Sequence, residues 1–193
     1  MSFIDPYLKK SIDLAGALMG LFLLAPIYLL IVLWVWIIAG RPVLHWSRRV
    51  GKGNRVFLMP KIRTMREQAP QVASHLLADP QAHLLPGCRW IRGLSLDEIP
   101  QLWAVLCGSM SLVGPRPALF NQQDLISART SKGIHVLLPG ITGWAQIGGR
   151  DELSVDQKVE MDFFYLKNRN TWLDLIILFR TVSRVIRRKG ISH

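Results

Sequence analysis

Residues 14–40 read LAGALMGLFLLAPIYLLIVLWVWIIAG and contain no charged side chain. Leucine, isoleucine, valine and tryptophan dominate this segment. An apolar run of about 20 residues or more has the length of a helix embedded in a bilayer. The run is too long for the apolar core of a signal peptide and has no small-residue cleavage site. The segment therefore predicts a membrane-embedded helix.

The flanks of this segment are basic on both sides, at Lys9, Lys10, Arg41, Arg48 and Arg49. Because basic flanks favour the cytoplasmic side of a membrane, both helix ends are drawn to one side, which a simple span cannot satisfy. Pro26 lies near the middle of the run, where it removes the bond to the carbonyl of Phe22 and forces a kink. A re-entrant helix and a kinked spanning helix are both compatible with these residues.

The whole chain is both basic and apolar. It has 24 Lys and Arg against 13 Asp and Glu, a formal net charge of +11, and half of its 193 residues are hydrophobic. This combination excludes a disordered basic tail and an ordinary soluble domain, and it predicts contact with anionic membrane lipid. Nucleic acid is the rival partner for such charge. The tryptophans lie mostly inside apolar runs, unlike the exposed aromatic residues of nucleic-acid binders, so we expect no nucleic-acid partner.

Several common kinds of site are absent from the sequence. Cys88 and Cys107 are far apart and form no C-x-x-C pair, so neither a zinc site nor a disulfide framework is indicated. The five histidines include no H-E-x-x-H arrangement, and the chain has no G-x-x-x-x-G-K-[ST] loop. Residues 51–54, GKGN, are typical of a hairpin turn and not of a phosphate cradle.

The rest of the chain predicts further helices, strands and loops. Residues 43–65 form strand, turn and strand, with Lys61 and Arg63 on one face. Residues 68–87 are polar with three prolines and predict a helical piece and surface loops. Residues 95–106 have a helical pattern. Residues 139–150 contain four glycines and predict a loop whose backbone takes unusual dihedral angles or approaches another group closely.

The C-terminal segment has the pattern of an amphipathic helix. Apolar residues recur at helical spacing, at Leu175, Leu178, Phe179, Val182, Val185 and Ile186, and a second stripe is basic, at Arg180, Arg184, Arg187 and Arg188. This pattern is typical of a helix that lies in the interface of an anionic membrane. A helix docked on the protein with a solvated basic face is the alternative.

Residues 92–103, RGLSLDEIPQLW, hold the best candidates for chemistry. Ser95 and Glu98 have capping-box spacing, Asp97 is the alternative cap, and both carboxylates then stand at a helix N-terminus. A carboxylate that faces a diphosphate can act as a nucleophile if a metal ion or basic side chains offset the repulsion between the two anions. The candidate basic residues are Lys61, Arg63, Arg92 and Arg116. Helix capping without chemistry is the simpler alternative.

Arg116 lies between two prolines in the sequence Pro115-Arg116-Pro117. The rigid neighbours lower the entropy cost of holding the guanidinium against a phosphate oxygen. A turn with an exposed arginine is the alternative for this motif taken alone.

Four motifs occur in order: KIRTM at 61–65, SLDEIPQLW at 95–103, MSLVGPRP at 110–117 and PGITGWAQ at 139–146. Together with WLDL at 172–175 they resemble the monotopic phosphoglycosyl transferases in their minimal form, over nearly the whole chain. This bacterial sugar transferase family starts the assembly of O-antigen, capsule, exopolysaccharide and N-glycans. The family often has serine before the kink proline, where this chain has Ala25.

The resemblance implies a covalent mechanism. Asp97 matches the family nucleophile, which attacks the β-phosphate of a UDP-sugar and releases UMP, after which undecaprenyl phosphate displaces the phosphosugar. Glu98 matches the acidic partner in this chemistry, and Mg²⁺ assists at the pair Asp97 and Glu98. Arg92 and Arg116 match phosphate-handling arginines, and Asp162 matches a further acidic position of the substrate site.

The resemblance also implies a membrane-associated α+β fold. Residues 1–41 would form a re-entrant membrane helix, and residues 42–193 a small α/β catalytic core with interfacial amphipathic helices. The expected location is the cytoplasmic face of the bacterial inner membrane, with downstream glycosyltransferases as candidate partners. A basic membrane-surface scaffold without catalytic activity is the alternative function, and it predicts no UMP release.

Overall fold

The computed structural model describes residues 5–66, 79, 81–149 and 153–187. Its α-helices and 3₁₀-helices (η) are α1 (Pro6–Ala39), η1 (Lys52–Asn54), α2 (Cys88–Gly93), η3 (Leu96–Glu98), α3 (Gln101–Leu106), α4 (Gln123–Ser131), η4 (Ile134–Val136), α5 (Trp144–Gly148), α6 (Val155–Asn168) and α7 (Thr171–Arg187). Its strands are β1 (Leu44–Val50), β2 (Val56–Ile62), β3 (Ser111–Val113), β4 (Ala118–Leu119) and β5 (Gly140–Thr142). The predicted helical piece in residues 68–87 lies mostly outside the described residues.

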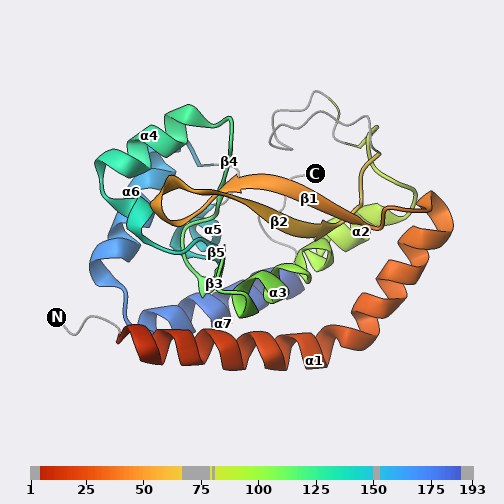
Figure 1. The fold of residues 1–193 in the computed structure, drawn as a ribbon, viewed down its shortest axis with the longest axis horizontal. Coiled ribbons are helices and arrows are strands. Elements are labelled where there is room, and N and C mark those ends of the chain that lie inside the picture. The colour runs from red at the N-terminus through yellow and green to blue at the C-terminus, as the bar shows by residue number, and fades with distance from the viewer. Residues whose placement is uncertain (1–4, 67–78, 80, 150–152, 188–193) are drawn as a thin grey trace.

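Helix α1 contains the apolar run up to Ala39 and begins before it, at Pro6. Asp5 caps this end by accepting a hydrogen bond from the amide of Tyr7 at 2.9 Å. Among the described residues, α1 is the one helix that is long and apolar enough to cross a membrane. Figure 1 shows that α1 bends sharply near its middle, and Pro26 is the proline inside it. The bend agrees with the kink expected from the missing backbone bond.

The two halves of α1 pack on different parts of the rest of the protein. Ala17, in the first half, belongs to an apolar cluster with Val105 of α3 and Leu112 of β3. In the second half, Ile31 and Val35 belong to a cluster that also contains Ile62, Cys88 and Ile91. Many apolar side chains of α1 point away from these clusters and are exposed, including Leu18, Met19, Phe22, Leu23, Leu29, Leu30, Leu33, Trp36 and Ile37.

The strands form two small sheets. β1 and β2 make the predicted antiparallel hairpin, with η1 at the predicted turn, and β4 pairs with the other side of β1. β3 and β5 form a separate parallel pair, with Ser111 opposite Gly140 and Val113 opposite Thr142. In the hairpin, Lys61 lies opposite His45. Arg49 is four residues after His45 on β1, and side chains four residues apart on a strand share a face. Arg49 therefore lies on the same face of the hairpin as Lys61.

The helical pattern predicted over residues 95–106 is confirmed for most of these residues, but they form two short helices, η3 and α3, and not one continuous helix. Ser95 has φ 54°, a left-handed conformation that separates α2 from η3, and α3 begins only after Pro100. Within the described part of the chain, Ser95 makes no capping hydrogen bond through its side chain, and α3 starts after Pro100 instead of at Asp97. The capping-box interpretation is therefore wrong, and the capping box that the structure contains is formed by Ser154 and Gln157 at the start of α6.

The glycine-rich segment 139–150 is not the predicted loop, because residues 140–142 form β5 and residues 144–148 form α5. The expected close approach is confirmed. A Cβ atom at Gly140 would lie 2.1 Å from the amide nitrogen of Gly114, and one at Gly143 would lie 2.1 Å from the carbonyl oxygen of Gly114. Glycine is needed here because two backbone segments touch, and neither Gly140 nor Gly143 has positive φ.

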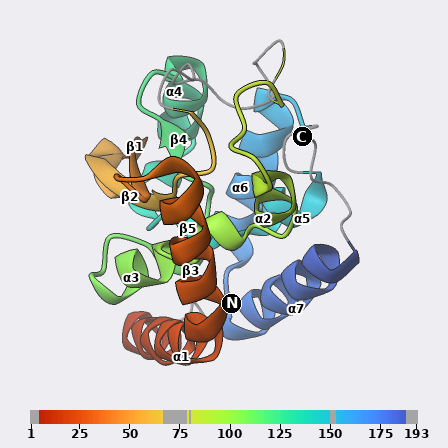
Figure 2. The ribbon, with the colours of Figure 1, turned by 90° about the vertical axis from the view of Figure 1, so that its right-hand side faces the viewer.

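Helix α7 confirms the predicted C-terminal helix over its described residues. Its exposed apolar side chains, at Trp172, Leu175, Phe179 and Val182, recur at helical spacing. On another side of the helix, Asp174 and Ile177 are buried against the core. Figure 2 shows α7 and the first half of α1 side by side at the same end of the molecule. Arg188 lies outside the described residues.

Candidate active site

Asp97 and Glu98 lie next to each other on η3 and are buried, with exposed fractions of 6% and 8%. The left-handed turn at Ser95 places them between α2 and α3 instead of inside a regular helix. Charged carboxylates are seldom buried unless cations or hydrogen-bond donors compensate them. The buried carboxylates therefore need compensation by the basic groups around them.

Two cations from distant parts of the chain meet on one oxygen of Glu98. The ammonium of Lys61, on β2, lies 2.8 Å from Oε1, and Nη2 of Arg116 lies 2.9 Å from the same oxygen. Lys61 comes from the hairpin and Arg116 from the turn between β3 and β4. The structure thus brings four predicted site residues together, Lys61, Asp97, Glu98 and Arg116.

Electrostatics at this cluster are set by burial and by opposite charges. Burial raises the pKa of Asp97 above the ordinary value, and the ammonium of Lys61 is the main opposing influence. Burial also lowers the pKa of Lys61, and the carboxylate of Glu98 opposes that shift. A desolvated carboxylate beside fixed cations is suited to attack an electrophile that carries negative charge, because the cations offset the repulsion.

The other two predicted arginines occupy different places. Arg92 lies in the last turn of α2, and its charge lowers the pKa of Asp97, so it belongs to the same electrostatic environment. Arg63 follows β2 and is 8% exposed, and its Nη2 donates to the carbonyl oxygens of Ala39 and Gly40. The contacts of Arg63 thus include the C-terminal end of α1, where a cation is favourable.

Asp162 lies on α6, is 1% exposed and forms an ion pair with Arg129 of α4. Nε and Nη2 of Arg129 lie 3.0 and 2.6 Å from Oδ2 of Asp162. Nη1 of Arg129 donates to the carbonyl oxygen of Arg116 at 2.7 Å. Asp162 is therefore linked through Arg129 to the turn that contains Arg116. Burial raises the pKa of Asp162, and Arg129 opposes that shift.

Two further arginines lie at the site. Arg129 was not predicted, and Arg49 was expected only as a basic flank of the apolar run. Nη1 of Arg49, on β1, donates to the carbonyl oxygen of Pro117 at 3.2 Å. Burial and the charge of Arg116 lower the pKa of Arg49 to about 10. Neither arginine stands in a distinctive motif, so no local signal could have identified them.

A second polar cluster joins α1 to the core. Asp13 of α1 is 6% exposed and accepts hydrogen bonds from Oγ of Ser111 at 2.7 Å and from the amide of Leu112 at 3.1 Å. Lys9 forms ion pairs with both Asp13 and Asp174 of α7, each at 2.9 Å. Lys9, expected only as a basic flank of the membrane segment, therefore also connects α1 to α7.

Comparison with known proteins identifies relatives over almost the entire chain. Residues 4–188 match the family described as bacterial sugar transferase. The uncharacterized sugar transferase EpsL of Bacillus subtilis is 40% identical, over 96% of this chain and 91% of that protein. The exopolysaccharide production protein ExoY of Rhizobium meliloti is 33% identical, over 94% of this chain and 87% of that protein.

Other relatives are longer. The undecaprenyl-phosphate galactose phosphotransferase of Salmonella typhimurium is 36% identical over 95% of this chain, and the chain spans only 41% of its length. Several other long relatives are likewise matched over less than half of their length. The matches to the family and to the shorter relatives cover the four motifs and the residues of the buried cluster, and they show that this chain belongs to the bacterial sugar transferase family.

Proposed function

We propose that this protein transfers a sugar 1-phosphate from a UDP-sugar to undecaprenyl phosphate, releases UMP and thereby initiates polysaccharide assembly. The observation that carries the proposal is the buried pair Asp97 and Glu98, with Lys61 and Arg116 both bound to Glu98. The names of long relatives, such as the Salmonella typhimurium galactose phosphotransferase, support the same reaction.

In the proposed reaction, a carboxylate oxygen of Asp97 attacks the β-phosphorus of the UDP-sugar. The bond from that phosphorus to the bridging oxygen breaks, and UMP leaves with the electron pair. An oxygen of undecaprenyl phosphate then attacks the aspartyl phosphosugar and restores the carboxylate. Glu98 keeps Lys61 and Arg116 beside the reacting phosphate, where their charges stabilise the oxygens that gain negative charge.

The two carboxylates fit the way in which proteins bind Mg²⁺. Magnesium is commonly held by one or two carboxylates, with waters and substrate phosphates as the other ligands. Asp97 and Glu98 offer such oxygen ligands, and among the described residues no group of three or more His, Cys, Asp or Glu side chains could hold a metal ion without further ligands. When bound there, Mg²⁺ would reduce the repulsion between Asp97 and the diphosphate.

The arrangement of α1 supports a re-entrant membrane helix. Near its start, Asp13 binds Ser111 and Leu112, and at its end Arg63 binds the last carbonyl oxygens. Both ends are thus attached to the same body, and the bend between them lies at the apolar middle (Figure 1). A helix that spanned the membrane would have one end on the far side. Residues 1–41 would then be the membrane segment and residues 42–193 the catalytic part.

The exposed apolar side chains of α7 and of the first half of α1, which lie at the same end of the molecule (Figure 2), support attachment to the membrane there. The side chains of Trp172 and Phe179 are 71% and 77% exposed. Together with the net charge of +11, this pattern supports binding to the anionic cytoplasmic face of the bacterial inner membrane.

Release of UMP tests the proposed reaction. The purified protein is incubated with Mg²⁺ and undecaprenyl phosphate, and UMP is measured over a panel of UDP-sugars. We expect UMP with at least one of them. If none yields UMP while the protein is folded, the catalytic proposal is wrong and the membrane-surface scaffold becomes the better account.

Cysteine labelling tests the topology. Single cysteines at positions 2 and 47, with Cys88 and Cys107 replaced by serine, are treated with a membrane-impermeant reagent on intact cells. We expect labelling at neither position, and labelling at position 2 alone would contradict re-entrance.

A further inference from the structure

We propose that Arg129 and Asp162 are positioning residues that hold the turn of residues 115–117 and thereby place the guanidinium of Arg116 beside Glu98. The inference rests on the proposed function, because Arg116 is taken to bind the reacting phosphate. It assigns Asp162 a role through Arg129 instead of a direct contact with substrate.

The turn of residues 115–117 has few backbone donors that could hold it in place. Pro115 and Pro117 have no backbone N–H, so within these three residues only Arg116 can donate a backbone hydrogen bond. The carbonyl groups of all three residues accept hydrogen bonds from elsewhere: Pro115 from the amide of Gly140 at 2.9 Å, Arg116 from Arg129 at 2.7 Å, and Pro117 from Arg49 at 3.2 Å. Arg129 therefore holds the carbonyl of the residue whose side chain binds Glu98.

Asp162 fixes the orientation of Arg129. Two of the guanidinium nitrogens bind Oδ2 of Asp162, and the third binds the carbonyl oxygen of Arg116. A planar guanidinium can make these contacts in fixed directions, whereas a lysine ammonium on a flexible stem cannot reproduce the fork. The pair is buried, with Arg129 9% and Asp162 1% exposed.

Burial of the pair needs a reason other than stability. Replacing a buried ion pair by apolar residues of similar volume is often neutral or stabilising, because desolvation of both charges is costly. The pair here also delivers a directed donor to one carbonyl oxygen. Precise placement of the Arg116 guanidinium is a functional reason for burying the ion pair of Arg129 and Asp162.

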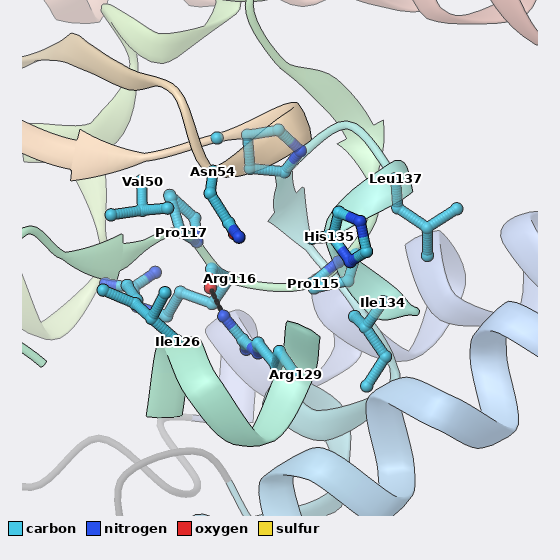
Figure 3. A pocket seen from close by; sticks show the side chains of 13 residues that line it. Val50, Asn54, Pro115, Arg116, Pro117, Ile126, Arg129, Ile134, His135 and Leu137 are labelled. Carbon is cyan, nitrogen blue, oxygen red and sulfur yellow. Dashed lines mark hydrogen bonds between the residues drawn. The ribbon is translucent and has the colours of Figure 1, made fainter. Parts of the chain in front are cut away.

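A small, partly open pocket borders the turn. It measures about 30 Å³ and lies between the turn, Asn54 of the hairpin, His135 of η4 and the guanidinium of Arg129. Figure 3 shows Arg129 at the edge of this pocket, with its hydrogen bond to the carbonyl oxygen of Arg116. Side chains do not fill this space, so packing contributes less to holding the turn on this side. The hydrogen bond from Arg129 restrains the turn there.

The test compares Arg129→Lys with a control pair between the same two helices. Lys132, which follows α4, binds Glu160 of α6, and both side chains are more exposed than the buried pair. Glu160→Gln therefore disturbs the junction of α4 and α6 without touching the turn. We expect Arg129→Lys to reduce kcat for UMP release by roughly 10-fold to 100-fold, the order expected for misplacing a catalytic group by about 1 Å. Glu160→Gln should stay close to wild type.

A double-mutant cycle identifies the route of the effect. If Arg129 acts through Arg116, then adding Arg129→Lys to Arg116→Lys should reduce the rate by less than about 2-fold, because the group that it positions is already gone. If the rate loss in the double variant equals the product of the losses in the two single variants, the proposal is wrong. An equal loss in Glu160→Gln would overturn it as well, because the effect would then be a general loosening of the two helices.

Two further measurements keep the proposal testable if Arg129→Lys fails to fold or if no UDP-sugar is turned over. The double substitution Arg129→Met with Asp162→Leu removes both charges together, so we expect a folded protein with the same loss of kcat. Amide hydrogen exchange of Gly140, whose N–H binds the carbonyl of Pro115, should accelerate in either variant, independently of activity. Unchanged exchange in a folded variant would refute the positioning role.

Discussion

Gly143→Ala disturbs the contact between the two backbone segments that place Arg116. Gly143 has φ −177°, which any residue adopts, so alanine introduces no backbone strain of its own. The new Cβ would lie 2.1 Å from the carbonyl oxygen of Gly114, two residues before Arg116, and it would also lie 2.7 Å from Oε1 of Gln146. Since ordinary contacts begin at 3.4 Å, the two segments must separate by roughly 1 Å.

A displacement of that size has two separable effects. Forcing a methyl group into a packed interface costs about 1–3 kcal/mol of stability. Moving a catalytic group by about 1 Å can reduce the rate roughly 100-fold. We therefore expect Gly143→Ala to remain folded at low temperature but to lose most of its UMP release, measured with thermal unfolding in the same detergent.

Gly148→Ala is the matched control, because it lies in the same segment and also meets a close neighbour. Its Cβ would lie 2.1 Å from Cε of Met161, the mobile end of a flexible side chain that can rotate away. We expect nearly unchanged turnover. Wild-type activity in a folded Gly143→Ala variant would refute the reasoning that backbone contact at Gly114 sets the position of Arg116.

Three other predictions concern the site and α1. Arg116→Lys should lose most activity with little change in unfolding temperature, because lysine keeps the charge but not the planar, two-pronged contact with phosphate; near wild-type turnover would contradict this. Asp13→Leu should lower the stability by about 1–3 kcal/mol in denaturant unfolding, since the amide of Leu112 loses a buried acceptor while Lys9 keeps its ion pair with Asp174. Pro26→Leu should straighten α1, so that a cysteine at position 2 becomes labelled from outside the cell; continued protection would show that the bend does not depend on the proline.

Elements governed by local composition could be predicted from the sequence. The apolar run of α1, the turn at residues 51–54 and the spacing of apolar residues in α7 each depend on a periodic or compositional signal that lies within one segment. The buried carboxylates could be singled out because Asp97 and Glu98 stand in a dense motif shared with a known family.

Features that depend on long-range contacts could not be predicted. Local propensity at Ser95 favours a helix cap, but the tertiary structure holds this residue in a left-handed conformation. β5 forms because residues 140–142 pair with β3, almost thirty positions earlier, and a glycine-rich segment gives little strand signal by itself. Arg129 acquires its role only when α4, α6 and the Arg116 turn meet, which no spacing in the sequence reveals.

The most direct test of the proposed mechanism is mass spectrometry of Asp97 before any lipid acceptor is present. If Asp97 is the nucleophile, UDP-sugar and Mg²⁺ alone should yield UMP and a phosphosugar adduct on the peptide that contains Asp97. Asp97→Asn should remain folded and show no adduct, because a neutral amide is a poor nucleophile. Full turnover by a well-folded Asp97→Asn variant would contradict the assignment.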